Sequence, residues 1–381
     1  MASNKPQFKI GLIGTGFMGK THVFGFAAVS RIFDVPYDVV LHSVADRTDD
    51  LAAVAARRLG FAKSSGDWKH LVADPEIDMI DITAPNALHK EIALAALAAG
   101  KHVYCEKPLA ARASDAGEMA QAAEAAGVKT QVGYNYLCNP MMGLARDLIT
   151  GGELGEIRLY RGIHAEDYMM DAASSFTFRH DAAGGGALAD LGGHALATAE
   201  YLLGSIERVM GDCVTVYNRR PDGHGGFRAV EVDDVGRAFL RFVNGASGSI
   251  EASWIATGRK MQHDFEIYGT KGALLFTQER FNELHFFSMK DAASRRGFRR
   301  IEAGPDHDPY GLFCVAPGHQ LGFNDLKTIE VARFLAAIAG KRPEPFNFRA
   351  GQRVQILVEA IQVSSRRKAW MDIPQNVGQS A

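Results

Sequence analysis

Three side chains of this 381-residue chain could together move a proton: a lysine, an aspartate and a histidine. Asp190 and His194 are four residues apart, so on a helix they share one face. The carboxylate can orient the imidazole, or both can point at one bound hydroxyl. Histidine exchanges protons near neutral pH, and the ammonium of Lys107 could stabilise a developing alkoxide. This set predicts chemistry on an alcohol, with His194 as general base and Lys107 as electrostatic stabiliser; the two can also exchange roles.

Each of the three also has an interpretation without chemistry. Lys107 would then be a salt-bridged surface residue, Asp190 the N-cap of a helix and His194 a buried core residue. Gly192 and Gly193 lie between Asp190 and His194. Inside a first helical turn each glycine costs about 1 kcal/mol relative to alanine. That cost indicates a close approach to the backbone, and it favours the chemical interpretation.

A cofactor for such chemistry is indicated near the start of the chain. Gly14, Gly16 and Gly19 have the spacing G-x-G-x-x-G after the apolar run Ile10–Ile13, which predicts a parallel strand. The first glycine permits a tight turn, the second lets the backbone approach a pyrophosphate, and the third lets the next helix pack on the strand. That helix is predicted to begin near Phe17, so its free N–H groups would face the phosphates. A purely structural glycine turn is the alternative.

The next predicted strand, Val39–Ala45, ends in an acidic residue, Asp46. A carboxylate there accepts hydrogen bonds from the ribose hydroxyls of NAD and repels the extra phosphate of NADP. Arg47 follows and could tolerate that phosphate, so NAD is predicted and NADP stays possible. The alternative for Asp46 is a helix N-cap before Asp49–Leu59.

Further strands are predicted at Met79–Thr83, His102–Cys105 and Thr130–Tyr134, with helical patterns between them. Such alternation specifies an α/β domain with a doubly wound parallel sheet, here predicted over residues 1–134. Ligands of these sheets bind beyond the carboxyl ends of the strands. The polar residues predicted to stand there are Asn86, His89, Glu106, Lys107 and Asn135.

From Gly155 onward alternating strand patterns predominate, with hairpin signals at Asn244–Gly245 and Gly269–Gly272. We therefore expect an α+β domain over residues 135–381 with a large, open, mainly antiparallel sheet. The open face is a candidate oligomer interface. The other face would be covered by helices predicted at Leu191–Leu203, Asp325–Ala339 and Ala350–Ala369.

Composition excludes several classes of partner. Lys plus Arg is 42 and Asp plus Glu is 44, and no basic run or cationic amphipathic stretch indicates nucleic acid or a membrane surface. The longest apolar run, Ile92–Ala99, is far too short to span a bilayer, and residues 1–9 lack the apolar core of a signal peptide. The four cysteines form no C-x-x-C pattern, so we expect a reducing cytoplasm and no metal site.

Four motifs resemble the glucose–fructose oxidoreductase / inositol dehydrogenase / rhizopine-catabolism (Gfo/Idh/MocA) family of dehydrogenases. They are G-x-G-x-x-G at Gly14–Gly19, T-A-P-N-x-x-H at Thr83–His89, E-K-P at Glu106–Pro108 and D-L-G-G-H at Asp190–His194. The resemblance implies a Rossmann domain, a C-terminal domain with an open sheet, NAD(P), a sugar or cyclitol substrate, and a homodimer or homotetramer assembled through that sheet. It places the family's catalytic residues on Lys107, Asp190 and His194. The predicted cofactor contacts are Gly14, Gly16, Phe17, Met18, Gly19, Asp46, Arg47, Thr83, Asn86, His89, Glu106 and Asn135.

Three segments are similar to family members that act on scyllo-inositol, L-glucose or levoglucosan. They are Ala165–Met169, Gly297–Ile301 and Gly318–Asn324. Arg179 and His319 are preferred substrate contacts because both lie in glycine-bearing segments outside the strand pattern. The predicted substrate contacts are Lys107, Asp167, Tyr168, Arg179, Asp190, His194 and His319.

Three functions remain in competition. The favoured one is an NAD-dependent dehydrogenase that oxidises a secondary hydroxyl of an inositol or pyranose. The second is a glycosidase that uses NAD transiently, oxidising a hydroxyl, eliminating, adding water and reducing again. The third is a non-enzymatic sensor that binds the dinucleotide and a sugar. The joint presence of Lys107, Asp190 and His194 argues against the sensor, which needs no proton acceptor.

Overall fold

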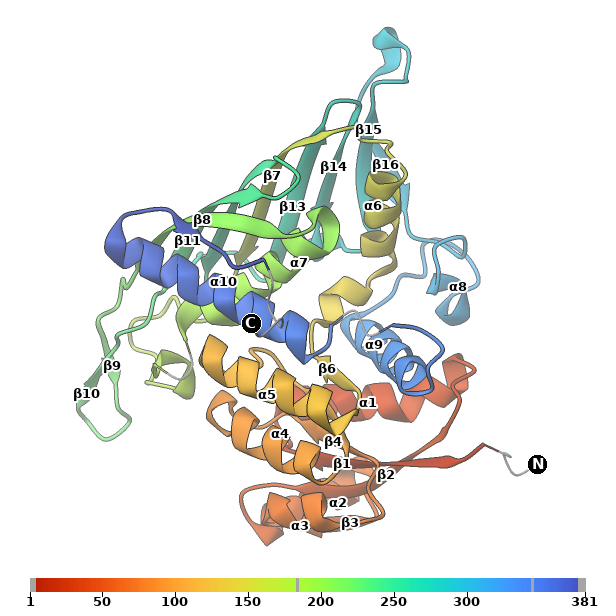
Figure 1. The fold of residues 1–381 in the computed structure, drawn as a ribbon, viewed down its shortest axis with the longest axis vertical. Helices are drawn as coiled ribbons and strands as arrows, with labels where there is room; N and C mark the ends of the chain where they lie inside the picture. Colours follow the sequence, from red (N-terminus) through yellow and green to blue (C-terminus); the bar gives the residue numbers. More distant parts are fainter. Residues whose placement is uncertain (1–4, 183–184, 344–345, 376–381) are drawn as a thin grey trace. The chain divides into compact units, whose positions relative to one another are not determined.

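The protein is described by a computed structural model that covers residues 5–182, 185–343 and 346–375 (Figure 1). It divides into two compact units. The first comprises Met1–Cys138 and Leu321–Arg353, and the second comprises Asn139–Gln320 and Val354–Ala381. The chain therefore returns to its first unit after most of the second has been built.

The first unit is built on a six-stranded sheet in the order β3-β2-β1-β4-β5-β6. All neighbouring strands are parallel. This is the strand order of a dinucleotide-binding doubly wound fold, and the order reverses between β1 and β4, where ligands of such sheets bind. The strands are β1 (Gln7–Ile13), β2 (Asp38–Ala45), β3 (Lys63–Ser65), β4 (Met79–Ile82), β5 (His102–Cys105) and β6 (Thr130–Val132). The predicted parallel sheet is confirmed, with β6 ending two residues earlier than expected.

Helices alternate with these strands as the sequence predicts. They are α1 (Phe17–Ile32), α2 (Asp49–Leu59), α3 (Trp68–Ala73), α4 (His89–Ala98) and α5 (Ala113–Ala126). The N-cap of α2 is Thr48, whose side chain accepts a hydrogen bond from the Leu51 amide. The alternative interpretation of Asp46 as the cap of this helix is therefore wrong.

The helix α9 (Phe323–Ile338) belongs to the first unit. Val331, Phe334 and Leu335 pack in one core cluster with Phe8 and Phe26. The expectation that this helix covers the antiparallel sheet is therefore wrong. Its apolar positions predict that it needs a buried face, but they do not say which sheet supplies it.

The second unit is built on a nine-stranded sheet in the order β16-β15-β14-β13-β7-β12-β11-β8-β17. Only β7 and β12 pair in parallel, and the other neighbours are antiparallel. Both predicted hairpins, β11–β12 and β13–β14, are present. The strands are β7 (Ile157–Ala165), β8 (Ile206–Val214), β11 (Val235–Phe242), β12 (Ser247–Ser253), β13 (Gln262–Gly269), β14 (Gly272–Thr277), β15 (Glu283–Ser288), β16 (Arg299–Glu302) and β17 (Met371–Asp372), with a separate pair β9 (Arg219–Pro221) and β10 (Phe227–Ala229).

Helices of the second unit lie against this sheet (Figure 1). They are α6 (Pro140–Thr150), α7 (Gly193–Leu203) and the part of α10 (Phe348–Arg367) that follows residue 353. A short helix, α8 (Tyr310–Phe313), follows β16 in the chain. Ser364 of α10 accepts a hydrogen bond from the Gly211 amide of β8 at 2.9 Å. Strand β11 alternates buried and exposed residues, so its other face, with Phe239 62% exposed, is uncovered. Among the described helices, none is both long enough and apolar enough to cross a bilayer.

Candidate functional site

The glycine-rich turn joins β1 to α1 at the carboxyl edge of the first sheet. Gly14 has φ +97°, and a Cβ there would lie 2.8 Å from the Thr83 backbone, so glycine is required. A Cβ on Gly19 would lie 2.3 Å from the Gly14 carbonyl oxygen, so this residue allows helix and turn to pack closely. Around Gly16, in contrast, a Cβ would meet no atom within 4 Å. The backbone is therefore open at the one glycine where a phosphate is expected to approach.

Two side chains brace this turn. The Thr83 hydroxyl donates to the Gly14 carbonyl oxygen at 2.7 Å, which ties the end of β4 to the end of β1. The Thr15 hydroxyl donates to Oδ2 of Asp46, and the Arg47 amide donates to Oδ1 at 2.7 Å. The Asp46 carboxylate is thus held at the carboxyl end of β2, where a ribose would meet it. Arg47 itself is exposed.

The start of α1 has the properties of an anion site. No side chain caps the helix, and its first turn contains no acidic residue. The amide Nδ2 of Asn135 is buried and has no hydrogen-bond partner among the described residues. The uncapped N-terminus of α1 and the open backbone at Gly16 fit a negatively charged dinucleotide, and the unpartnered donor of Asn135, which follows β6 in the same unit, fits a polar ligand. Phe17, 69% exposed, stacks on Phe323 with ring centroids 5.8 Å apart.

His89, a predicted cofactor contact, is fully buried at the start of α4. Its Nδ1 lies 2.9 Å from the Pro108 carbonyl oxygen, and its Nε2 lies 2.9 Å from the Ala84 carbonyl oxygen. Burial lowers the pKa of this imidazole, although the two carbonyl groups act against the shift. His89 therefore joins the loop after β4 to the E-K-P segment after β5, and it positions the backbone beside Lys107. Asn86 lies half-buried in the same loop.

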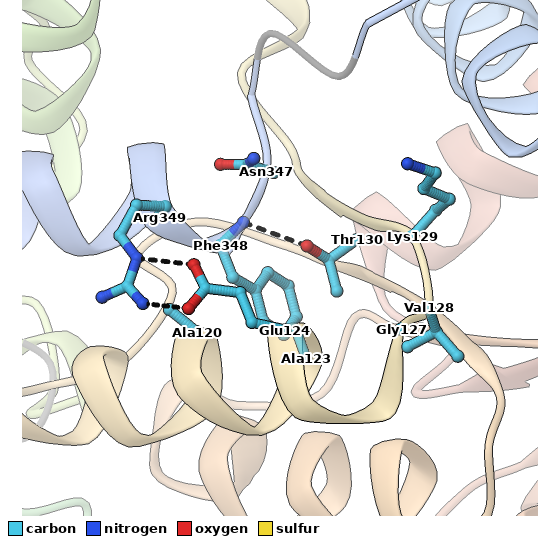
Figure 2. Close-up of a pocket in the computed structure, with 10 residues that line it drawn as sticks. All are labelled: Ala120, Ala123, Glu124, Gly127, Val128, Lys129, Thr130, Asn347, Phe348 and Arg349. Atoms are coloured by element: carbon cyan, nitrogen blue, oxygen red, sulfur yellow. Dashed lines mark hydrogen bonds and ion pairs between the residues drawn. The ribbon is translucent and has the colours of Figure 1, made fainter. Parts of the chain in front are cut away.

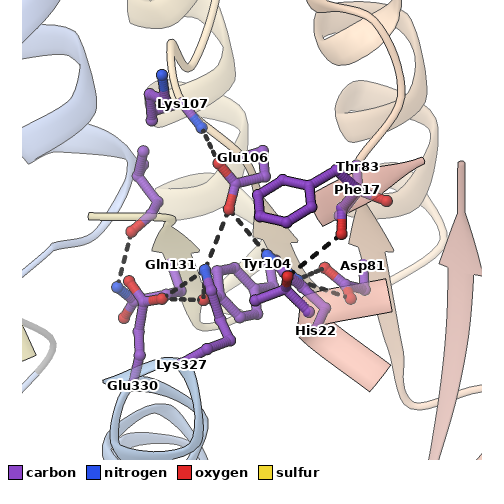
Figure 3. Close-up of polar contacts among 12 residues, drawn as sticks. Phe17, His22, Asp81, Thr83, Tyr104, Glu106, Lys107, Gln131, Lys327 and Glu330 are labelled. Atoms are coloured by element: carbon purple, nitrogen blue, oxygen red, sulfur yellow. Dashed lines mark hydrogen bonds and ion pairs between the residues drawn. The ribbon is translucent and has the colours of Figure 1, made fainter. Parts of the chain in front are cut away.

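Glu106 lies inside a buried polar network, and Figure 3 shows its carboxylate between a histidine, a lysine and a backbone amide. Its Oε1 lies 2.8 Å from His22 Nε2 and 3.1 Å from Lys327 Nζ. Its Oε2 accepts the Lys107 amide at 3.2 Å. On the other side His22 Nδ1 lies 2.9 Å from Asp81 Oδ1. The carboxylate of Glu106 thus fixes the main chain of the half-buried Lys107 from within the unit.

Lys327 uses all three ammonium donors inside this network. Besides Glu106, it contacts Glu330 at 2.7 Å and the Tyr104 hydroxyl at 2.9 Å. Tyr104 in turn donates to Glu330. Burial alone would raise the pKa of Glu106, but Lys327 and His22 lower it well below its usual range. Each charge here has an opposite neighbour, as a buried charge requires.

His22 completes the charge balance. Burial alone would lower its pKa, but Asp81 and Glu106 raise it above the usual value. Both ring nitrogens face carboxylate oxygens, so both donate and the ring is an imidazolium. The predicted cofactor contact Glu106 is therefore engaged by the protein itself in this structure.

In the second unit the segment around Asp190 is a π-helical turn, Leu188–Gly192, that continues into α7. Such turns are frequent at functional sites. The turn is capped by Asp233, whose Oδ2 accepts the Leu188 amide at 2.7 Å. The interpretation of Asp190 as an N-cap is therefore wrong. A Cβ on Gly192 would lie 2.8 Å from Leu188 Cδ1, so a larger residue would have to displace that side chain, and the protein's own packing favours glycine here.

The structure brings three predicted substrate contacts together. The Tyr168 hydroxyl donates to Asp190 Oδ2 at 2.7 Å, and Arg179 Nε donates to the same oxygen at 3.0 Å. Burial and the neighbouring Asp190 carboxylate raise the pKa of Tyr168, so its hydroxyl remains a donor at neutral pH. Tyr168 is 40% exposed and Asp190 is half-buried. This group presents a carboxylate, a phenol and a guanidinium, the types of side chain that bind hydroxyls.

His194 is 6% exposed and lies beside two other imidazoles. Its ring centroid is 5.5 Å from that of His164 and 6.1 Å from that of His263. Two further predicted substrate contacts lie elsewhere in the second unit. Asp167 accepts Lys260 Nζ at 2.7 Å, and that bond lowers its pKa. His319 is exposed in the loop after α8.

A cavity of about 230 Å³ lies between α5, β6 and the start of α10 (Figure 2). Its guanidinium, from Arg349, is paired with Glu124 through bonds to both carboxylate oxygens. No predicted site residue lines this cavity. Elsewhere, His42, Asp74 and Glu76 bring potential metal ligands within 4.8 Å of one another, but Lys63 Nζ lies 3.3 Å from Asp74 and 2.9 Å from Glu76. The Lys63 ammonium thus already pairs with both carboxylates.

Sequence reasoning missed the residues that support the site. Among them are His22, Asp81, Lys327 and Glu330 in the first unit, and His164 with Glu166 in the second. One signal was available: Asp81 lies inside the fully buried strand M-I-D-I, where an unpaired carboxylate is too costly. Its partner, however, is 59 residues away in sequence.

Comparison with known proteins gives a consistent assignment. A family model described as "Oxidoreductase family, NAD-binding Rossmann fold" matches residues 8–134, and the GFO/IDH/MocA C-terminal domain matches residues 142–275. Levoglucosan dehydrogenase of Pseudarthrobacter phenanthrenivorans is 39% identical, with 97% of this chain and 99% of that protein covered. The scyllo-inositol 2-dehydrogenase (NAD(+)) of Bacillus subtilis is 26% identical, with 88% of each covered. A solved levoglucosan dehydrogenase in complex with NADH and levoglucosan superposes with a TM-score of 0.93 at 39% identity, covering 97% of this chain and 100% of that one.

Proposed function

Because the chain belongs to the GFO/IDH/MocA family of oxidoreductases, we propose that it oxidises a secondary hydroxyl of a cyclic polyol or pyranose and transfers the hydride to NAD. Relatives over nearly the whole chain are named for an anhydrosugar and an inositol, which supports a compact ring substrate with several hydroxyls. An anhydrosugar such as levoglucosan is the first candidate, and an inositol is the second.

The observation that carries this proposal is the bonding of Tyr168 and Arg179 to Asp190, one helical turn before His194. A carboxylate with two bound donors is pre-oriented, so it need not reorganise when a substrate hydroxyl arrives. His194, on the same segment, would accept the hydroxyl proton. Lys107, fixed through its amide by Glu106, would stabilise the developing alkoxide. When bound, the nicotinamide supplies the hydride acceptor.

NAD is proposed over NADP because the Asp46 carboxylate is held in place by Thr15 and by the Arg47 amide. A fixed carboxylate accepts both ribose hydroxyls, and it repels a phosphate on either. The exposed Arg47 adjoins it, so NADP as a weaker cofactor fits the same geometry.

The location and assembly of the protein are also part of this proposal. All four cysteines are free thiols, as a reducing cytoplasm would leave them. The exposed Phe239 on the uncovered face of the second sheet would be buried in a homodimer or homotetramer.

A substrate panel tests the function. Levoglucosan, scyllo-inositol, myo-inositol, L-glucose and D-glucose would be incubated with the protein and either NAD or NADP, and formation of the reduced cofactor would be measured. We expect net NADH from at least one anhydrosugar or cyclitol. Cleavage of a glycoside without net NADH would instead indicate a glycosidase that oxidises its substrate transiently. Binding of NAD without any turnover would indicate a non-enzymatic sensor.

A further inference from the structure

Three imidazoles form a buried cluster in the second unit, which we call the imidazole cluster: His164 of β7, His194 of α7 and His263 of β13. All three are at most 6% exposed. The centroid of His164 is 5.5 Å from that of His194 and 4.7 Å from that of His263. His164 therefore lies within interaction range of both other rings. One of those rings, His194, is the proton acceptor in the proposed function.

His164 is flanked by two oxygen acceptors. Its Nδ1 lies 3.1 Å from the Leu191 carbonyl oxygen, and its Nε2 lies 3.2 Å from Glu166 Oε1. A neutral imidazole donates from one nitrogen only. Unlike His89, which faces two neutral carbonyl groups, His164 faces a carboxylate at Nε2, and this counter-charge favours the imidazolium. Glu166 is 20% exposed and supplies the counter-charge. The structure thus holds a positive charge inside the imidazole cluster.

Two other titratable groups near His194, Asp190 and His263, differ from His164 in their charge. Asp190, in the preceding turn, is balanced by Arg179. His263 lies 3.0 Å from the Thr198 hydroxyl, and burial together with the charge on His164 lowers its pKa well below the usual value. This ring is therefore neutral at physiological pH.

Two further elements, β12 and α6, also pack on α7. Strand β12 presents the uncharged Ala252 and Ser253. From α6, Arg146 stacks over Tyr201, seven residues further along α7. Of the two described imidazoles in ring contact with His194, His164 is the one with a carboxylate partner.

We propose that the His164–Glu166 pair tunes His194: the His164 imidazolium disfavours a second positive charge nearby, so His194 stays unprotonated and ready to accept a proton at neutral pH. This inference rests on the proposed function for its catalytic meaning, but not for its electrostatics. His164 acts through His194 and is a positioning residue in this sense. Two like charges at this separation compete for one proton.

Nuclear magnetic resonance of the histidine-labelled full chain tests the electrostatics without any substrate. Peaks of His194 and His164 are assigned by their loss in H194N and H164N. In H164N we expect the titration midpoint of His194 to rise by on the order of one pH unit, because the neighbouring cation is gone. In E166Q we expect the midpoint of His164 to fall by a similar amount, because the carboxylate that holds its second proton is gone.

Glu283 and His285 offer a matched control in the same sheet. They form a histidine–glutamate pair at 3.5 Å on β15, separated from β7 by β13 and β14. E283Q should leave the midpoints of His164 and His194 unchanged. An unchanged or lower His194 midpoint in H164N, or an unchanged His164 midpoint in E166Q, would overturn the proposal.

The kinetic arm separates this inference from the function on which it rests. If His194 is the base, the acidic limb of kcat/KM in H164N shifts to higher pH together with the His194 midpoint. If the His194 midpoint shifts in the resonance titration but the kinetic profile does not, the electrostatic inference stands and His194 is not the general base.

Discussion

The two units each bury a polar cluster beside a residue of the proposed chemistry, but the clusters are built from different groups. In the first unit His22 lies between Asp81 and Glu106, and Lys327 lies between Glu106 and Glu330. Each cation there contacts two carboxylates. In the second unit His164 pairs with the Glu166 carboxylate, and the described rings beside it are imidazoles.

The difference teaches what each cluster is suited to do. A paired buried network gains little net free energy, because desolvation offsets the Coulomb attraction, but its hydrogen bonds favour one arrangement of the groups. Such a network fixes a position, here the backbone of Lys107. A single charge pair beside other imidazoles, as in the second unit, can instead change how readily a neighbouring ring takes a proton.

The largest expected effect comes from removing the two residues that the clusters adjoin, Lys107 in the first unit and His194 in the second. Lys107→Ala and His194→Ala should each lower kcat at least about a hundredfold, because one loses alkoxide stabilisation and the other the proton acceptor. NAD affinity, measured by fluorescence titration, should survive in both. Turnover like that of the wild type in either variant would refute its assigned role.

Unfolding by urea probes the paired network of the first unit. Lys327→Met leaves Glu106 and Glu330 without their shared cation, so the free energy of unfolding should fall by about 3–5 kcal/mol. The double variant K327M/E330Q removes one stranded carboxylate and should lose less. Equal losses in the single and double variants would show that charge pairing is not what holds this network.

In the second unit, Asp233 gives a pH test. Burial raises its pKa from 3.8 to about 6. Because the folded-state pKa is the higher one, its contribution to stability is fully present below pH 3.8 and is lost as pH rises through about 6. Asp233→Asn keeps an acceptor for the Leu188 amide without a charge. As pH rises over this interval, the free energy of unfolding of the Asp233→Asn variant should therefore increase relative to that of the wild type, by at most about 3 kcal/mol. A pH-independent difference between the two proteins would exclude a buried, titrating Asp233.

The smallest effect concerns the cofactor rather than either cluster. Asp46→Ala should weaken NAD binding by roughly tenfold, because hydrogen bonds to the ribose hydroxyls are lost, and it should weaken NADP binding less. Dissociation constants for both cofactors, measured side by side, give the ratio. Equal losses for the two would remove Asp46 from cofactor selection.

The sequence predicted what is local. The G-x-G-x-x-G turn, the parallel strands and both hairpins follow from spacing and turn residues, so they needed no knowledge of distant parts of the chain. The sequence predicted three separate substrate contacts, Asp190, Tyr168 and Arg179. It did not predict that Tyr168 and Arg179 donate hydrogen bonds to Asp190. His22 with Asp81, and Glu106 with Lys327, were not foreseen because their separations of 59 and 221 residues leave no local pattern. The return of α9 to the first unit was misjudged for the same reason.

Hydride transfer itself is the most direct test of the account. Levoglucosan or scyllo-inositol carrying deuterium on its carbinol carbons would be incubated with the protein and NAD, and the reduced cofactor analysed by mass spectrometry. We expect NADH that has gained a deuterium from the substrate, in equal amount to a ketone product. Glycoside cleavage without accumulated reduced cofactor, or reduced cofactor without the label, would contradict the proposed oxidation.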